Sequence, residues 1–548
     1  MDLHRQCLSM VSSQFLRPRA SFLALTAICL TAFITIAILS DRVFEHVPHS
    51  EDEVAYIFQA KVFAQGRLAV PTPPHRQAFW TPFVVDYQGQ RFSIKPPGWS
   101  LLLSLGVRLN APWLVNTLLG AATLALITWL GYCFYSQDPK GLKDPWGLWQ
   151  VGLWAAGLGL VTPSFLFLSS SPLSHTASLF WSTLVLGGLF YLTIGYVSRV
   201  TYHVSRYYAV LTGLALGAAF ITRPFAAVGI GLAVGVFLLI LVIRREIRWT
   251  ALLWLMLGGL PVAALLPLYW WAITGDPTFN AFLLVWPYDR IGFGPDIGPY
   301  GYSLSDALFI NTRLKLTALA TGLFGWPGWS NLMFLPIPFL ARRANRWDWL
   351  LLGTLLGLIG VHIFYWAFGG ADGGFPRYYY DALPALLLLT ARGIQISGDV
   401  MADWQKRVPL PLREGPGENL TPQPPLRSGE GENPLRWLPI GLVIIFITYN
   451  LVWNLPPLLA AQKGKYGITA AQLQAVERAN LPEPALVIVK NVKKWSDFAA
   501  PFAANSPTLD GPVVYASDEG AAVTQKLREQ FKDRVCWELI GERLRQCP

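Results

Sequence analysis

The sequence predicts a mainly α-helical, polytopic membrane protein: a bundle of about eleven transmembrane helices followed by a small C-terminal α/β domain. Of its 548 residues, 53% are hydrophobic and only 14% are charged, whereas soluble domains carry about 25% charged residues. Segments 22–40 and 251–271 contain no Asp, Glu, Lys or Arg, and each is long enough to cross a hydrocarbon layer of about 30 Å.

The connections between the apolar segments predict the topology. Lys and Arg gather in alternate connections, such as Lys140 with Lys143 and Arg342 with Arg343, so the positive-inside rule places these in the cytoplasm, the N-terminus inside and the C-terminal tail outside the plasma membrane. This distribution explains the net charge of +10 through contact with anionic lipids rather than nucleic acid. The expected spans are residues 21–40, 113–135, 149–168, 175–196, 207–222, 224–243, 250–272, 316–340, 348–368, 378–397 and 437–459.

Composition divides the chain into four parts. A transmembrane region over 1–400, with an external loop at 41–112, precedes a Pro-, Gly- and Glu-rich stretch at 401–436 that we interpret as a disordered cytoplasmic linker. A last span at 437–460 leads to an extracytoplasmic domain at 461–548. Apolar spacing there predicts helices over 468–479 and 519–531 and strands over 485–489, 512–515 and 535–539. Cys536 and Cys547 lie in this tail; spacing alone leaves open whether they form a disulfide.

The first external loop begins with an acidic cluster. Apolar spacing after Ser50 predicts a helix that lies in the membrane interface. Ser50 and Glu53 fit a capping box at its start, and acids are favoured there by the helix dipole. A carboxylate at the membrane surface can also accept a proton as a general base, so Asp52 and Glu53 are candidates for either role.

Cationic residues recur on the same external side. Lys95 precedes Pro96 and Pro97 at a predicted helix start, where its ammonium can bind a phosphate or simply reach the interface. Arg223 and Arg377 lie at the edges of predicted spans, and ionisable residues at such depth suggest function. Each has a structural alternative: Arg223 contacts lipid head groups, or Arg377 pairs with the residue four positions later on a helix.

Further polar and aromatic residues on that side are candidates for substrate binding. His175 begins a predicted span, although a single histidine is more often a packing residue. Tyr378 and Tyr379 can stack on a sugar or a prenyl chain. Asp289 lies in an aromatic, glycine-rich external loop at 273–315. The sequence contains no P-loop, Rossmann glycine fingerprint, G-x-S-x-G or H-E-x-x-H motif, so cytosolic nucleotide chemistry has no support.

Taken together, these residues resemble the GT-C superfamily of membrane glycosyltransferases, in the branch that contains protein O-mannosyltransferases and lipid A aminoarabinose transferases. The resemblance covers residues 20–400 and rests more on the order of the motifs than on any one of them. The matching motifs are Asp52-Glu53 after the first span, Lys95-Pro96-Pro97, Thr222-Arg223-Pro224 and Arg377-Tyr378-Tyr379.

The resemblance implies an inverting transfer of a sugar from a polyprenyl-phosphate donor to a protein, lipid or glycan acceptor on the extracytoplasmic face. Asp52 would deprotonate the acceptor, and Lys95, Arg223 and Arg377 would hold the donor phosphate. In aminoarabinose transferases an acid that helps to bind a metal precedes the lysine. Here Ile94 stands in its place, so no cofactor is certain and a divalent metal is left open.

Two other functions compete with this interpretation. A transporter or flippase of lipid-linked sugars would show internal repeats and polar residues at mid-membrane, whereas here no repeat is evident and the acids and Lys95 gather on one face. A non-catalytic scaffold would leave Asp52, Lys95 and Arg377 without a shared purpose. Both alternatives account for these residues less well than an enzyme does.

Overall fold

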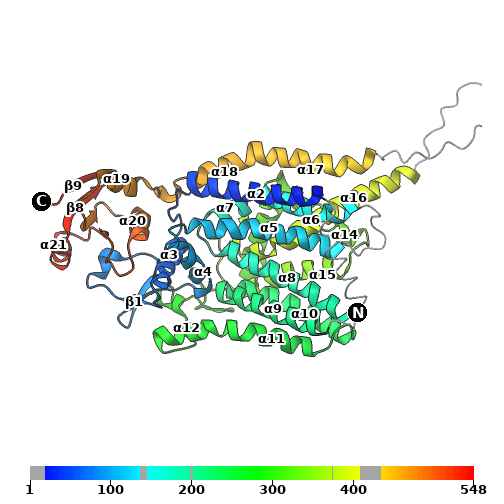
Figure 1. The fold of residues 1–548 in the computed structure, drawn as a ribbon, viewed down its shortest axis with the longest axis horizontal. Coiled ribbons are helices and arrows are strands. Elements are labelled where there is room, and N and C mark those ends of the chain that lie inside the picture. Colours follow the sequence, from blue (N-terminus) through cyan, green and yellow to red (C-terminus); the bar gives the residue numbers. More distant parts are fainter. Residues whose placement is uncertain (1–18, 136–144, 198–201, 373, 408–433) are drawn as a thin grey trace, which may run out of the picture.

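The computed structural model describes residues 19–135, 145–197, 202–372, 374–407 and 434–548. Most of these residues form long helices that lie side by side, and one end of the bundle carries a second, smaller layer and the C-terminal domain (Figure 1). The bundle helices are α2 (Arg19–Arg42), α5 (Trp113–Tyr135), α6 (Pro145–Leu160), α7 (Pro163–Ser170), α8 (His175–Val197), α9 (Tyr202–Thr222), α10 (Pro224–Ile243), α11 (Thr250–Ala263), α12 (Leu265–Thr274), α13 (Arg313–Gly322), α14 (Ile337–Leu340), α15 (Arg346–Ile363), α16 (Leu383–Arg407), α17 (Leu438–Tyr449) and α18 (Leu455–Gln462). The mainly helical class is confirmed.

The described helices make the chain a multi-pass membrane protein, with fewer spans than expected. Seven helices of the described part are long and apolar enough to cross a membrane, or eight if α6 and α7, bent by 66°, form one span. The described helices that meet this length and hydropathy criterion are thus fewer than the expected count of about eleven. Segment 316–340 is broken into α13, a 3₁₀ turn and α14, because Gly325 and Gly328 take left-handed backbone angles and interrupt the helix. Helices α9 and α15 are not among the helices that are long and apolar enough to cross a membrane.

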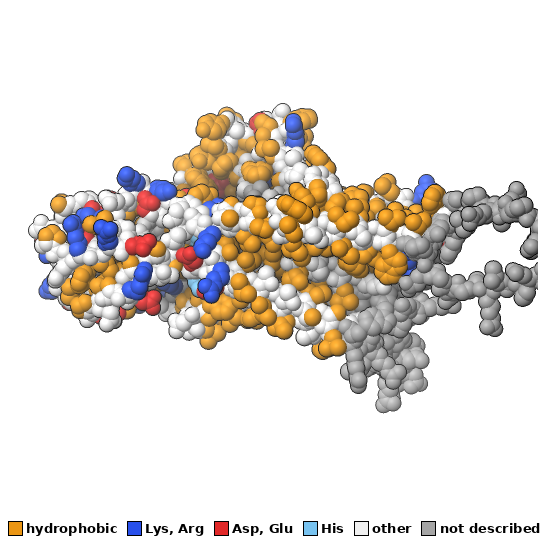
Figure 2. Space-filling view, turned by 90° about the horizontal axis from the view of Figure 1, so that it is seen from above, with side chains coloured by type: hydrophobic (Ala, Val, Ile, Leu, Met, Phe, Trp, Pro, Cys, Tyr) orange, Lys and Arg blue, Asp and Glu red, His pale blue; other side chains and the backbone are white. Residues whose placement is uncertain are grey.

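Side chains that would face lipid cover the flanks of the bundle. Phe22, Leu257 and Ile445 are 65%, 60% and 64% exposed, although large apolar side chains are costly to leave in water. Figure 2 shows hydrophobic side chains spread over the helices, while charged side chains gather on the C-terminal domain and the neighbouring end of the bundle. This separation fits a helical part embedded in a bilayer and an end layer in water.

The first external loop forms the end layer. It contains the two helices α3 (Glu51–Ala64) and α4 (Pro97–Arg108), as interfacial helices were expected, and also a sheet that was not. Strands β1 (Val70–Pro71), β2 (Val84–Tyr87) and β3 (Gln90–Ser93) pair antiparallel in the order β1-β3-β2. Gln88 and Gly89 both have positive φ between β2 and β3, which is the backbone of a tight two-residue hairpin.

The C-terminal domain has the expected α/β character. Its sheet has the order β7-β6-β8-β9, with β6 parallel to both β7 and β8 and β9 antiparallel to β8. Residues 408–433, most of the predicted linker, lie outside the described residues, and α16 extends beyond the expected linker start at 401. The domain's elements are α19 (Ala471–Ala479), β6 (Ala485–Val489), α20 (Ala499–Ala504), β7 (Val513–Ser517), α21 (Ala521–Gln530), β8 (Val535–Ile540) and β9 (Arg543–Gln546).

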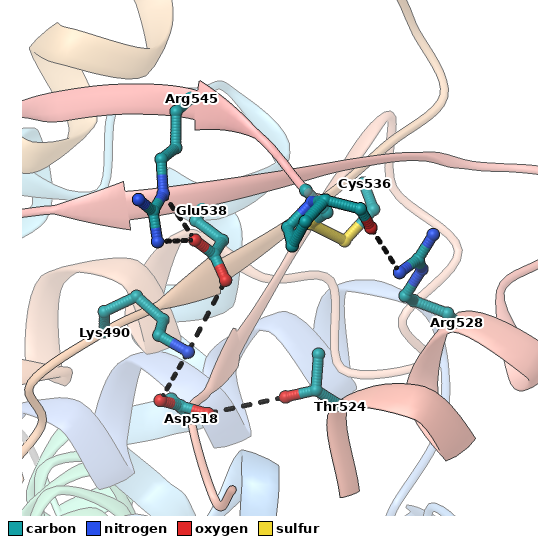
Figure 3. The surroundings of a disulfide bond; sticks show 9 residues. Lys490, Asp518, Thr524, Arg528, Cys536, Glu538 and Arg545 are labelled. Atoms are coloured by element: carbon teal, nitrogen blue, oxygen red, sulfur yellow. Dashed lines mark hydrogen bonds and ion pairs between the residues drawn. A yellow bond between two sulfur atoms is a disulfide. The ribbon is translucent and has the colours of Figure 1, made fainter. Parts of the chain in front are cut away.

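A disulfide and a set of linked ion pairs stabilise the sheet of the C-terminal domain. Cys536 and Cys547 form a disulfide that ties β8 to the chain after β9, which settles the open pairing. Beside it, the Lys490 ammonium lies 2.7 Å from the Asp518 carboxylate and 3.5 Å from that of Glu538 (Figure 3). These contacts join the carboxyl ends of the three parallel strands.

The C-terminal domain rests on α3. One hydrophobic cluster contains side chains of α3, the hairpin, α12 and the domain sheet. The Phe58 and Phe502 ring centroids are 5.8 Å apart. The Lys61 ammonium donates to the backbone carbonyls of Ala503, Ala504 and Asn505 at 2.5, 3.2 and 3.0 Å. The domain is therefore packed against the helix that carries the acidic cluster.

Candidate active site

A cavity of about 810 Å³ opens where α3, the bundle and the C-terminal domain meet. It contains residues from the start of α3, the segment after β3, the junction of α9 and α10, the loop before α13 and the start of α16. Every residue proposed from the sequence lines it except Glu53 and Tyr379. Segments that are distant in the chain thus supply one site.

Asp52 lies in the first turn of α3, facing the cavity. Its carboxylate contacts the Lys95 ammonium, and its Oδ2 lies 3.6 Å from Nη1 of Arg377. Burial alone would raise the pKa of Asp52, but Lys95, Arg377 and Arg223 outweigh it and hold the pKa below its ordinary value. Asp52 is therefore an anion between two cations.

The neighbouring acids have different surroundings. The Glu53 side chain is buried, and its carboxylate accepts a hydrogen bond of 2.6 Å from the backbone N–H of His49, just before the helix. Ser50 Oγ accepts from the Glu53 N–H at 3.4 Å, so both residues act in capping. Glu51, which the sequence did not single out, lines the cavity beside Asp52. Its pKa is raised by burial and by the charge of Asp52.

Lys95 is placed by the hairpin and by the start of α4. Strand β3 ends two residues earlier, and Pro96 and Pro97 set the turn into the helix. The Lys95 ammonium lies 3.9 Å from the Phe83 ring centroid and 4.9 Å from that of Phe282, a cation–π arrangement. With only 7% of its surface exposed, Lys95 is not an interfacial lysine reaching for water.

The start of α4 packs closely on two other cavity segments. A Cβ on Gly98 would lie 2.7 Å from the backbone carbonyl of Ile221, so glycine permits α4 to approach the end of α9. The Trp99 indole donates a 2.8 Å hydrogen bond to the carbonyl of Pro172, in the loop before His175. These contacts bring Lys95, Arg223 and His175 to the same cavity.

Arg223 interrupts the run from α9 to α10 and is held by a residue that the sequence did not identify as a partner. Its Nη1 lies 3.5 Å from Oδ2 of Asp381, on the neighbouring α16 segment. Asp381 also accepts hydrogen bonds from the hydroxyls of Ser178 and, at 3.1 Å, Ser182. The signal available in sequence was a carboxylate at a span start, which at membrane depth requires a partner.

Arg377 extends from the turn before α16. Its Nε donates to the carbonyl of Gly369, and Nη1 faces Asp52. The alternative of an Arg377–Asp381 helix pair is not the arrangement found, since Asp52 and Asp381 neutralise different arginines. The fork geometry of a guanidinium suits a bidentate phosphate contact.

The two tyrosines after Arg377 separate. Tyr378 lines the cavity, stacked on His362 with ring centroids 4.9 Å apart. Tyr379 is fully buried in the bundle core and does not line the cavity. Asp289 accepts hydrogen bonds from the Tyr365 hydroxyl at 3.0 Å and the Trp366 indole at 2.8 Å, and burial raises its pKa.

His175 and Tyr56 complete the polar wall. Only 5% of His175 is exposed, and neither ring nitrogen has a hydrogen-bond partner among the described residues. Its ring meets that of Tyr380 edge to face at 6.2 Å. Tyr56, one turn after Asp52, shares a 3.0 Å hydrogen bond with Ser174; the i, i+4 spacing was the signal that could have found it.

The donor set of the cavity does not fit a divalent metal. No group of three or more His, Cys, Asp or Glu able to hold a metal occurs in the described part of the chain. Ile94 is completely buried and offers no ligand, and Asp52 faces Lys95 and Arg377. The three cations of this cavity instead suit a ligand that is itself an anion.

The fold has counterparts among solved structures. ArnT from Cupriavidus metallidurans bound to undecaprenyl phosphate is similar with a TM-score of 0.52 at 14% identity, over 94% of this chain and 89% of that chain. The apo state gives a TM-score of 0.53 at 14% identity over 95% and 93%. The Archaeoglobus fulgidus oligosaccharyltransferase is less similar, with a TM-score of 0.43 at 14% identity over 90% of this chain and 64% of that chain. No family model and no curated protein sequence matches. The chain is therefore a multi-pass membrane protein with a fold similar to that of ArnT from Cupriavidus metallidurans.

Proposed function

We propose that this protein is a membrane glycosyltransferase that transfers a sugar from a polyprenyl-phosphate donor to an acceptor on the extracytoplasmic face. The observation that carries the proposal is the contact of Asp52 with Lys95 and Arg377 inside one cavity. A carboxylate beside cations provides a base and an anion site together, which transfer from a phosphate leaving group needs. The ArnT structure of the same fold is bound to undecaprenyl phosphate.

The proposed reaction is an inverting displacement. The acceptor hydroxyl oxygen forms a bond to the anomeric carbon while the bond from that carbon to the phosphate oxygen breaks. The leaving phosphate keeps the electron pair and is stabilised by Lys95, Arg223 and Arg377. Asp52 receives the acceptor proton. A phosphate that engages Lys95 and Arg377 draws their charge away from Asp52, so the pKa of Asp52 rises and the carboxylate becomes a better base.

Three residues would bind the sugar. His175 offers a buried imidazole with two available nitrogens, Asp289 offers a carboxylate to hydroxyl groups, and Tyr378 offers a ring face. These residues are assigned to the sugar and the three cations to the phosphate because a neutral sugar needs hydrogen-bond partners and apolar faces, whereas the phosphate needs cations.

The orientation rests on the two ends of α10. Arg223 precedes the helix at the cavity, and Arg244 follows it; 20 residues of helix span about 30 Å. Arg343 and Arg346 lie with acidic partners at the Arg244 end. Basic residues mark the cytoplasmic side, so the cavity faces outward. The Cys536–Cys547 disulfide supports this placement, since disulfides persist in oxidising compartments.

The test is transfer of radiolabelled sugar from polyprenyl-phosphate donors to membrane acceptors, comparing the wild type with Asp52→Asn. We expect transfer by the wild type and a loss of about 10²–10⁴-fold in the variant. Asp276→Asn is the matched control, because Asp276 is exposed and does not line the cavity. Normal transfer by Asp52→Asn would overturn the base assignment. Failure of the wild type with a broad donor panel would overturn the proposed function.

A further inference from the structure

Two aromatic side chains of the C-terminal domain reach the cavity that contains Asp52. Tyr466 and Trp495 line it, although they belong to the part of the chain that follows α18. Their ring centroids are 6.2 Å apart and the ring planes meet at 59°. The rings therefore form an open angle at the domain side of the cavity.

Tyr466 is held in an unfavourable backbone conformation. Its φ is 61° and its ψ is 14°, a left-handed conformation that is rare for a bulky residue and costs free energy. The side chain is nevertheless 57% exposed, so burial of the ring does not repay this cost. The Lys494 ammonium donates a 3.2 Å hydrogen bond to the Tyr466 carbonyl and helps to hold the turn.

Trp495 is fixed from the other side. It begins a short 3₁₀ turn in which the Asp497 carboxylate accepts hydrogen bonds from the backbone N–H groups of Lys493 and Lys494, at 3.0 and 3.1 Å. Lys494 thus contacts both turns through its backbone and its side chain. The two rings are positioned by one set of contacts.

The domain also has a defined position relative to Asp52. Helix α3 carries Asp52 at its start and binds the domain through Lys61 near its end. Just before α3, the Glu45 carboxylate accepts a 2.8 Å hydrogen bond from the Ala470 N–H. The aromatic pair and Asp52 consequently line one cavity from two separate parts of the chain.

We infer that Tyr466 and Trp495 form the acceptor subsite, and that the acceptor is a glycan whose sugar ring packs against this aromatic pair. Arg223 and Arg377 come from bundle segments, and Lys95 contacts the same carboxylate as Arg377. The prenyl chain of the donor has to stay with the membrane-spanning bundle, which leaves the domain side of the cavity for the acceptor. Sugar rings present C–H faces that pack on aromatic rings, while their hydroxyl groups remain in water. A cavity of about 810 Å³ lies at the upper end for one small ligand, so two sugars fit. This inference rests on the proposed function, because only a transferase has an acceptor.

The test uses the full chain in lipid nanodiscs with two readouts. Saturation-transfer difference NMR measures binding of maltotriose and of triacetylchitotriose, with a Gly-Ser-Thr hexapeptide as the peptide probe. Thermal stabilisation by undecaprenyl phosphate measures the donor side independently. The variants are Tyr466→Ala and Trp495→Ala. Trp80→Ala is the matched control, because Trp80 is 59% exposed at the same end but does not line the cavity.

We expect at least one trisaccharide to bind, binding to weaken about tenfold in both cavity variants, and no change in Trp80→Ala or in stabilisation by undecaprenyl phosphate. Absence of sugar binding to the wild type, equal binding by all variants, or ring-dependent binding of the peptide alone would each overturn the inference. Ring-dependent sugar binding without stabilisation by undecaprenyl phosphate would support a glycan subsite while contradicting the polyprenyl-phosphate donor.

Discussion

Arg223 and Asp381 meet across the bundle, with Nη1 of the arginine 3.5 Å from Oδ2 of the aspartate. Their side chains are 12% and 0% exposed. The contact joins the α9–α10 junction to the segment that leads into α16, and it supplies the counter-charge for an arginine at the cavity wall. The cavity that contains Asp52 thus depends on a carboxylate that does not line it.

Replacing Asp381 with Asn is expected to destabilise the protein strongly. Asn still accepts hydrogen bonds from Ser178 and Ser182 but leaves Arg223 as a buried charge without a counter-ion, which costs about 3–5 kcal/mol. Thermal unfolding in detergent measures the loss. The double variant Arg223→Gln with Asp381→Asn should recover part of it. Additive losses in the double variant would show that the two side chains do not interact.

The activity of the wild type should persist to acidic pH. Since the pKa of Asp52 is held below its ordinary value by Lys95, Arg377 and Arg223, the base remains ionised, and the acid limb of kcat/KM lies below the pH at which an ordinary aspartate titrates. The ion pairs of Asp52 also stabilise the fold in a pH-dependent way. Their contribution is present above the pKa that Asp52 has in the unfolded chain, and it is lost as the pH falls through the pKa of Asp52 in the folded protein.

Lys95→Gln should move that acid limb to higher pH. Removing the nearest cation removes the largest charge that lowers the pKa of Asp52, so protonation begins at higher pH, and donor KM rises as well. A pH–rate profile of both proteins measures the shift, with Lys526→Gln on the exposed face of α21 as control. An unchanged acid limb would mean that Asp52 does not limit the rate.

Gly98→Ala is expected to disturb the cavity without changing any polar side chain. Its new methyl group would overlap the backbone of Ile221 at 2.7 Å, and such overpacking costs about 1–3 kcal/mol. Lower thermal stability and reduced transfer should appear together. Gly235→Ala in α10 is the matched control because its Cβ meets open space. Equal behaviour of the two variants would contradict the close approach of α4 and α9.

Lys61→Met should loosen the C-terminal domain. The substitution removes three contacts to backbone carbonyls, and hydrogen bonds to a charged group are worth about 1.5–3 kcal/mol. Hydrogen exchange across α20 should become faster, and acceptor KM should rise while donor KM stays constant. Protection of α20 equal to that of the wild type would show that other contacts suffice to dock the domain.

The sequence alone determined the membrane class, the α/β character of the tail and the principal charged residues of the cavity. Long apolar segments indicate directly that the surrounding solvent is the hydrocarbon of a bilayer. Strands of the tail, such as 485–489, are predicted from continuous apolar residues. Asp52, Lys95, Arg223 and Arg377 were identified because charge at the membrane edge is costly and needs a reason.

Only the tertiary structure decided which of these residues touch. That Asp52 faces Lys95 and Arg377, while Glu53 caps its own helix, depends on a rotation of about 100° per helical residue relative to distant segments. The broken segment 316–340 and the pairing of Arg223 with Asp381 depend equally on neighbours far along the chain. Tyr466 and Trp495 carry no local signal at all, because their place in the cavity follows from docking of a separate domain onto α3.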